Sequence, residues 1–150
     1  MRVSVIGGSS VSETISQQAE RVGELLAKRG HEVVCGGLGG VMEAVCRGAR
    51  HHDGSTIGIL PGSDQKTANP YVETAIATGM GNARNTLVVL NGDAAIAIDG
   101  RTGTLSEIGL ALDYGRPVAA LHSHDISGFE GYHQVDSPEE AISTVETRCQ

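Results

Sequence analysis

The sequence of 150 residues predicts an α/β protein in which one parallel sheet carries helices on both faces. Short β-branched apolar runs alternate along it with longer segments whose apolar residues recur at helical spacing. Two of these runs lead into glycine-rich turns, at residues 35–40 and 99–104, and each turn opens a predicted helix. No linker, repeat or low-complexity tract interrupts residues 1–150, which predicts a single domain.

The first half of the chain predicts the order strand, helix, strand, helix, strand. Val3–Ile6 is the first expected strand. A helix from about Glu13 to Arg29 follows, opened by the capping-box pattern Ser10-Val11-Ser12-Glu13 and ended by Gly30. The other elements of this half are a strand at His31–Cys35, a helix at Val41–Arg50 and a strand at Ser55–Leu60.

The second half resumes the alternation after a polar, turn-rich stretch at 63–70. That stretch leaves two interpretations open, a lid over a binding cleft or an ordinary surface loop. At 137–140, Ser-Pro-Glu-Glu supplies an N-cap residue, a proline at the first helical position and an acid at the third, which predicts the start of the last helix. The elements expected between them are a strand at Val72–Ala77, a helix at Gly81–Leu90, a strand at Ala94–Ile98, a helix at Thr102–Tyr114 and a strand at Val118–Leu121.

Composition narrows the classes of partner. The chain has 11 basic and 18 acidic residues, a net charge of −7, and its basic residues are scattered, so we expect no nucleic acid partner. No apolar run approaches the roughly 20 residues that span a bilayer, so we expect no membrane association. Three cysteines without CxxC spacing, and a strand at the very start of the chain, favour a reduced cytoplasmic setting.

The glycine-rich turns predict binding of a phosphorylated small molecule. Glycine lets the backbone approach a ligand closely, and a helix N-terminus presents unpaired N–H groups to an anion. Both turns follow strands, and the carboxyl ends of parallel strands share one edge of the sheet, where the first strand also ends in small residues. The binding residues expected from these loops are Gly7, Gly8, Ser9, Gly36, Gly37, Gly39 and Gly40.

Several familiar nucleotide sites and catalytic motifs are absent from the sequence. The first strand is not followed by GxGxxG, and no acidic residue stands at the ribose-binding spacing, so NAD is not expected. No GxxxxGK[ST] sequence occurs, which argues against a nucleoside triphosphatase, and no GxSxG elbow predicts a serine hydrolase. The four aromatic residues are few anchors for a dedicated protein-binding module.

An ordered set of motifs resembles the Lonely Guy-like proteins. These motifs are CGGLGGVMEA at 35–44, TIGILP at 56–61, Arg84, and GRTGTLSE at 100–107. The resemblance implies a Rossmann-like fold, a doubly wound parallel sheet in three α/β/α layers, and assembly as a homodimer or higher homo-oligomer. It also implies hydrolysis of the N-glycosidic bond of a nucleoside 5′-monophosphate, with no cofactor required.

Residue by residue, the resemblance assigns catalytic roles to Arg84 and Glu107. An oxocarbenium-like transition state is stabilised by a nearby carboxylate, and an arginine fixes the anion. Arg101 replaces a glycine of the family motif and offers a bidentate phosphate contact of its own. The residues that match the phosphate-binding turn are Gly100, Thr102, Gly103 and Thr104.

Departures from the family motif leave a second function open. Asp99 stands in place of a proline, and Asn85 stands where hydrolase members carry lysine. In these departures, and in the sequence Val-Met-Glu-Ala at 41–44, the chain resembles an uncharacterised branch of the family. That branch is similar to molybdenum cofactor carrier proteins, which bind a pterin phosphate without transforming it. The alternatives are therefore a phosphoribohydrolase and a non-catalytic carrier or sensor.

Some of the same residues have purely structural alternatives. Thr104-Leu105-Ser106-Glu107 is itself a capping-box pattern, so Glu107 could serve only as a helix cap. Arg84 could belong to a solvated helix face. His122-Ser123-His124-Asp125 offers metal-ligating side chains, but three ligands in one short loop seldom form a preformed site, and no metal is expected.

Overall fold

The computed structural model describes residues 1–149, in which seven strands form one parallel sheet. The strands are β1 (Arg2–Gly7), β2 (Glu32–Cys35), β3 (Thr56–Leu60), β4 (Thr74–Ala77), β5 (Ala94–Ile98), β6 (Val118–Leu121) and β7 (Tyr132–Val135). Their order across the sheet is β4-β3-β2-β1-β5-β6-β7, and every neighbouring pair is parallel. The predicted α/β fold class is confirmed.

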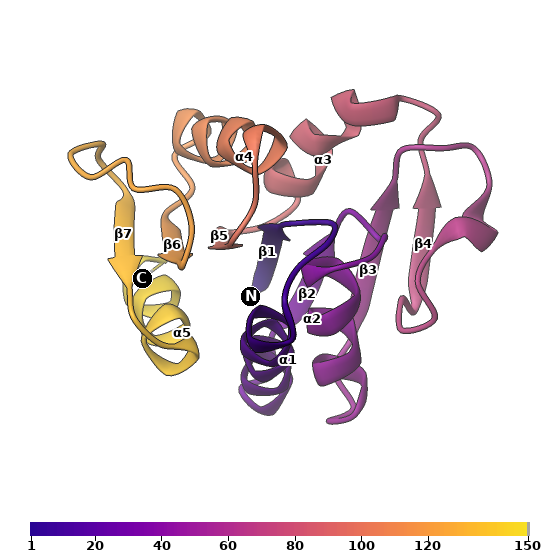
Figure 1. The fold of residues 1–150 in the computed structure, drawn as a ribbon, viewed down its shortest axis with the longest axis horizontal. Helices are drawn as coiled ribbons and strands as arrows, with labels where there is room; N and C mark the ends of the chain where they lie inside the picture. The colour runs from indigo at the N-terminus through magenta and orange to yellow at the C-terminus, as the bar shows by residue number, and fades with distance from the viewer. Residues whose placement is uncertain (150) are drawn as a thin grey trace.

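Helices cover both faces of the sheet and complete three layers (Figure 1). One face packs against α1 (Glu13–Lys28), α2 (Val41–Arg50) and α5 (Pro138–Arg148). The other packs against α3 (Asn85–Leu90) and α4 (Thr102–Asp113). Each face of the sheet has its own buried apolar core, as expected when a central strand such as β5 is buried along its whole length. The Rossmann-like, doubly wound prediction is confirmed.

The strand order reverses between β1 and β5. From β1 the chain builds β2, β3 and β4 to one side, then crosses back and builds β5, β6 and β7 to the other. At such a switch point the loops after neighbouring strands diverge to opposite faces, and a crevice opens beyond the carboxyl ends of the strands. The fold therefore places the loops after β1 and β5 around one crevice.

Two helical glycines bring α1 and α2 into close contact. A Cβ on Gly48 would lie 1.9 Å from the carbonyl oxygen of Glu20, and one on Gly23 would lie 2.0 Å from the carbonyl oxygen of Val45. The helices pack backbone to backbone at these points, which is possible only without side chains there. This contact fixes α2, and so fixes the glycine-rich turn that precedes it.

Three predicted details differ from the structure. Residues 81–90 form a short 3-10 helix, η2 (Gly81–Arg84), followed by α3, rather than one helix. Ser12, not Ser10, caps α1, because its Oγ accepts a hydrogen bond from the Ile15 N–H at 3.3 Å. Strand β7 was not expected, since it is a four-residue edge strand that pairs only with β6 and has a weak sequence signal.

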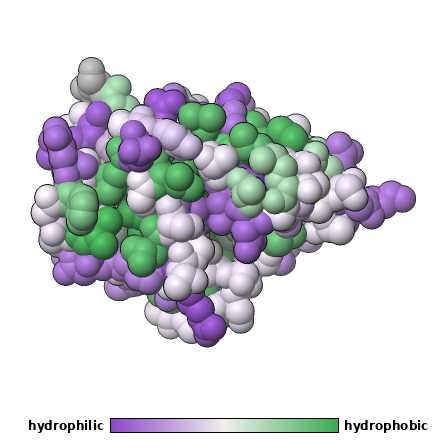
Figure 2. Space-filling model, turned by 90° about the horizontal axis from the view of Figure 1, so that it is seen from above, coloured by the Kyte–Doolittle hydropathy of each residue, from purple (hydrophilic) through white to green (hydrophobic). Residues whose placement is uncertain are grey.

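The face formed by α3 and α4 carries exposed apolar side chains. Figure 2 views the molecule from this side and shows hydrophobic patches among polar ones. Leu90 of α3 and Leu105 and Tyr114 at the two ends of α4 are exposed. Within residues 1–149, none of the helices is long and apolar enough to cross a membrane.

Candidate functional site

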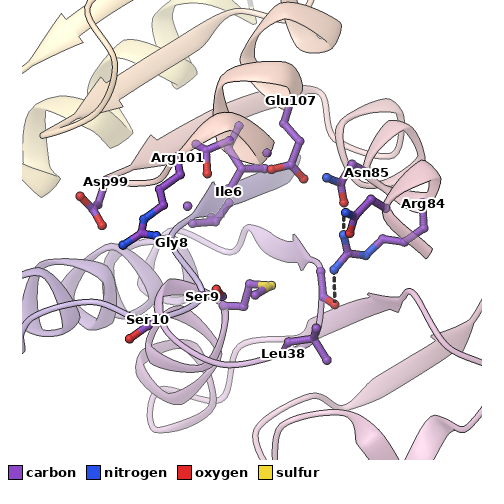
Figure 3. Close-up of a pocket in the computed structure, with 17 residues that line it drawn as sticks. Ile6, Gly8, Ser9, Ser10, Leu38, Arg84, Asn85, Asp99, Arg101 and Glu107 are labelled. Carbon is purple, nitrogen blue, oxygen red and sulfur yellow. Dashed lines mark hydrogen bonds between the residues drawn. The ribbon is translucent and has the colours of Figure 1, made fainter.

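A cleft of about 440 Å³ opens at the switch point, beyond the ends of β1, β2 and β5 (Figure 3). Its volume lies within the range of about 300–1,000 Å³ that is usual for small-molecule sites. The structure brings residues from four separate parts of the chain to this cleft. The predicted site residues that line it are Gly7, Gly8, Ser9, Gly36, Arg84, Arg101, Gly103, Thr104 and Glu107.

The other predicted glycines act on the backbone rather than on the cleft surface. Gly37 (φ 77°) and Gly40 (φ 64°) adopt left-handed conformations, and a Cβ on Gly40 would lie 2.2 Å from the carbonyl oxygen of Gly8. The Val41 N–H at the start of α2 donates to that same carbonyl at 2.9 Å. This helix N-terminus therefore holds the β1 loop in place. The predicted residues outside the cleft lining are Gly37, Gly39, Gly40, Gly100 and Thr102.

The turn between β5 and α4 is strained and braced. Asp99 (φ 53°) and Gly100 (φ 103°) are both left-handed, which is unfavourable for the aspartate. The loop after β6 supports the turn: the Ser123 hydroxyl donates to the Asp99 carbonyl at 2.7 Å, and His124 Nε2 donates to the Arg101 carbonyl at 2.8 Å. These braces were missed in the sequence, because nothing local links the two loops.

The loop at 122–125, considered above as a possible metal site, uses polar side chains in hydrogen bonds within the protein. His124 is engaged with the Arg101 carbonyl, and Asp125 accepts hydrogen bonds from the backbone and side chain of Ser127. Among residues 1–149, no group of three or more histidine, cysteine, aspartate or glutamate side chains is arranged to hold a metal ion.

Arg84 is a buried anchor rather than a solvated helix residue. Its side chain is 7% exposed, so the solvated-face alternative is wrong. Its Nε donates to the Ile59 carbonyl at 2.8 Å, its Nη2 donates to the Gly36 carbonyl at 3.3 Å, and its Nη1 donates to Asn85 Oδ1. Burial lowers the pKa of Arg84, although nearby Glu107 opposes the shift. The guanidinium thus ties together the ends of β2 and β3.

Glu107 is a buried carboxyl group that faces the cleft (Figure 3). It is 8% exposed and makes no hydrogen bond or ion pair with any of the described residues. Burial raises its pKa to about 7, and the positive charge of Arg84 only partly opposes the shift. The capping alternative is wrong, since α4 begins at Thr102 and its N-cap position is Arg101.

The opposite end of the cleft offers donors for an anion. Neither Ser9, Ser10 nor Arg101 uses its backbone N–H in a hydrogen bond within residues 1–149. The N-terminus of α4 adds its partial positive charge, and the exposed Arg101 side chain extends toward Gly8 in Figure 3. Asp99 also lines this end and forms no ion pair with Arg101, so the arginine remains free to meet a ligand.

Fold and cleft together define a Rossmann-like α/β protein with a polar cleft at its topological switch point. The chain matches the SLOG cluster4 family over residues 1–147 and belongs to that family. It is 42% identical over 143 residues to an uncharacterized protein of Archaeoglobus fulgidus, covering 95% of this chain and 93% of that protein.

Solved structures with the same fold include molybdenum cofactor proteins. The molybdenum cofactor binding protein from Rippkaea orientalis is 34% identical, with a TM-score of 0.91 over 99% of this chain and 97% of that one. The molybdenum cofactor carrier protein from Chlamydomonas reinhardtii is 27% identical, with a TM-score of 0.91 over 98% and 96%. The predicted similarity to such carriers is confirmed, while the Lonely Guy-like assignment stays a prediction.

A more distant likeness bears on the fold alone. DNA processing protein A from Helicobacter pylori is 21% identical, with a TM-score of 0.72 over 98% of this chain and 80% of that one. The expected absence of a nucleic acid partner stays a prediction that rests on the net charge of −7.

Proposed function

We propose that this protein is a carrier that binds a phosphorylated pterin or nucleotide, with molybdenum cofactor as the leading ligand, and holds it without transforming it. The observation that carries the proposal is the polarity of the cleft, with unpaired anion donors at one end and an unpaired buried carboxyl group at the other. The similarity to molybdenum cofactor proteins supports the choice of ligand.

The phosphate is expected at the end formed by the β1 loop and the α4 N-terminus. Free backbone N–H groups and a helix dipole favour a negative charge there, and Arg101 supplies a charge-assisted contact. The Asp99 carboxylate at the same end repels an anion, and Arg101 offsets this repulsion. Phosphate affinity is therefore expected to depend strongly on Arg101.

The surroundings of Arg84 favour holding over catalysis. Three of its N–H groups are already used by the Ile59 and Gly36 carbonyls and by Asn85, so few are left to donate to charge that develops on a ligand during a reaction. Asn85, at the position of the hydrolase lysine, brings no second cation. Binding without turnover requires neither free donors on Arg84 nor a second cation beside it.

One observation favours hydrolysis of a nucleoside 5′-monophosphate as a second candidate. The pKa of Glu107 is about 7, in the range that suits proton transfer at neutral pH, and the carboxyl group faces the cleft. In this case the ionised Glu107 carboxylate would stabilise positive charge on the ribose as the bond to the base breaks, accept a proton from the water that attacks C1′, and pass that proton to the leaving base. Glu107→Gln would then abolish base release and leave ligand binding in place.

Native mass spectrometry of the freshly purified protein separates these functions. A carrier retains a phosphate-bearing mass, and it releases no base when incubated with a panel of nucleoside 5′-monophosphates. Arg101→Gln should lose the ligand at least about tenfold more readily. Arg148→Gln, a matched change on the exposed end of α5, should not.

Other outcomes of this experiment are equally clear. Base release that disappears in Glu107→Gln identifies the hydrolase. Failure to bind molybdenum cofactor, pterin phosphates and all nucleoside monophosphates overturns the proposal. The expected homo-oligomer is read from the same spectra, and the exposed apolar residues of α3 and α4 are its proposed interface.

A further inference from the structure

The two ends of the cleft present different chemical groups to a ligand. In Figure 3, Arg101 extends toward Gly8 at one end, and Glu107 lies at the other end beside Asn85 and Arg84. The first end supplies donors and positive charge. The second supplies a buried acceptor, the Glu107 carboxyl group, which is without a partner among residues 1–149.

The Glu107 carboxyl oxygens are not among the fully buried side-chain atoms that lack a partner, so they keep access to the cleft and are available to a ligand. Glu107 is more than nine-tenths buried, and its carboxyl group faces open space in the cleft. Arg84, the nearest cation, donates to three other acceptors. A ligand that brings N–H donors to Glu107 would therefore gain both hydrogen bonds and charge complementarity.

Asn85 adds a donor at the same end. Its Oδ1 accepts from Arg84 Nη1, which orients the amide so that Nδ2 is the group left free. Within the described chain, Nδ2 makes no hydrogen bond of its own. The end of the cleft therefore presents an acceptor pair at Glu107 and a donor at Asn85.

We infer that Glu107 and Asn85 read the edge of a heterocycle that carries an amino group, a ring N–H and a carbonyl group in sequence, the 2-amino-4-oxopyrimidine edge shared by guanine and pterins. The two N–H groups meet the two oxygens of the Glu107 carboxylate, and the ring carbonyl accepts from Asn85 Nδ2. The inference rests on the proposed function and adds to it the class of ring that the cleft selects.

Other purine rings fit this end less well. Hypoxanthine keeps the ring N–H and the carbonyl but lacks the amino group, so one hydrogen bond to Glu107 is lost. Adenine presents a ring nitrogen acceptor toward the carboxylate and an amino group toward the amide donor, so both contacts become repulsive. Discrimination of this kind arises because the site's buried polar groups are left unpaired by the wrong ring.

Three soluble monophosphates that differ only at this edge test the inference. Calorimetric titration of the wild-type protein at pH 8, where the Glu107 carboxyl group is mostly ionised, should give GMP an affinity at least about tenfold above that of IMP, since IMP loses one hydrogen bond to a charged group. AMP should bind more weakly than IMP. Base release is monitored in the same samples so that turnover is not mistaken for binding.

Two variants assign the preference to residues. Glu107→Gln should reduce the ratio of GMP to IMP affinity to near one, and Glu130→Gln, an exposed carboxylate outside the cleft, should leave it unchanged. Asn85→Ala should weaken GMP and IMP by the same factor and strengthen AMP, because it removes the donor that repels the adenine amino group. Circular dichroism confirms folding of each variant.

Outcomes against the inference are distinct from failure of the proposed function. Equal affinities of the wild-type protein for GMP, IMP and AMP, or a GMP preference that persists in Glu107→Gln, would overturn the inference and leave ligand binding itself intact. Absence of binding for every monophosphate and for pterin phosphates would overturn both.

Discussion

Two glutamates, one on the α1 surface and one in the cleft, have opposite surroundings. Glu24 on α1 accepts from Lys28 Nζ at 2.6 Å and from Arg21 at 2.7 Å, and these hydrogen bonds lower its pKa to about 2. Glu107 in the cleft has no partner in the described chain, and burial raises its pKa to about 7. The protein thus pairs the Glu24 carboxylate on the helix surface and leaves the Glu107 carboxyl group in the cleft open to a ligand.

The largest expected effect comes from disturbing the backbone that frames the cleft. Gly40→Ala forces a left-handed residue to carry a Cβ at 2.2 Å from the Gly8 carbonyl oxygen. Strain and overpacking together should lower the free energy of unfolding by about 4 kcal/mol. Gly103→Ala is the control: a Cβ there meets no atom within 4 Å, and alanine favours the helix by about 0.5–1 kcal/mol. Urea denaturation measures both, and equal losses would contradict the assigned role of Gly40.

Glu107→Gln tests the contrast between the two glutamates through the pH dependence of the free energy of unfolding. The pKa in the folded state is about 7 against 4.5 when unperturbed, so folding favours the protonated form and stability is lost as pH rises from about 4.5 through 7. Glutamine removes this loss. We expect the variant to be more stable than the wild type by about 3 kcal/mol at pH 8, and little changed at pH 4. An effect independent of pH would show that Glu107 has a structural partner.

Arg84→Leu tests two effects of Arg84, its hydrogen bonds to backbone carbonyls and the influence of its charge on the pKa of Glu107. The Ile59 and Gly36 carbonyls lose a buried donor, which should lower the free energy of unfolding by about 2 kcal/mol. The pKa of Glu107 should rise above 7, because the only opposing contribution is the positive charge of Arg84. NMR titration of Glu107 measures that shift. Arg84→Lys should preserve much of the charge effect, and an unchanged pKa in Arg84→Leu would contradict the prediction.

Glu24→Gln should have the smallest effect. The pair partners Lys28 and Arg21 are largely exposed, and exposed ion pairs contribute up to about 1 kcal/mol, less in high salt. Thermal unfolding at low and high salt provides the measurement. A loss larger than that of Arg84→Leu would mean that the helix surface, and not the cleft framework, depends on its charges.

The elements that were predicted well have strong local signals. The apolar runs of β1 and β5 and the Ser137 N-cap of α5, whose Oγ accepts from the Glu140 N–H at 3.1 Å, can be recognised within a few residues of sequence. Strand β7 was missed because its pairing with β6 across the loop at 122–131 has no local signature. The same loop braces the Asp99 turn through Ser123 and His124, a role that only its position in space reveals.

The sequence by itself determined the alternation of strands and helices and the glycine positions, because propensity, periodicity and motif spacing are properties of neighbouring residues. The candidacy of Arg84 and Glu107 came from the resemblance of its motifs to the Lonely Guy-like proteins. Tertiary structure decided what these residues do. It placed Gly37 and Gly40 outside the cleft lining, attached Arg84 to the ends of β2 and β3, and left Glu107 mostly buried without a partner in the described chain. Burial and pairing depend on residues brought together from distant parts of the chain, which local sequence does not specify.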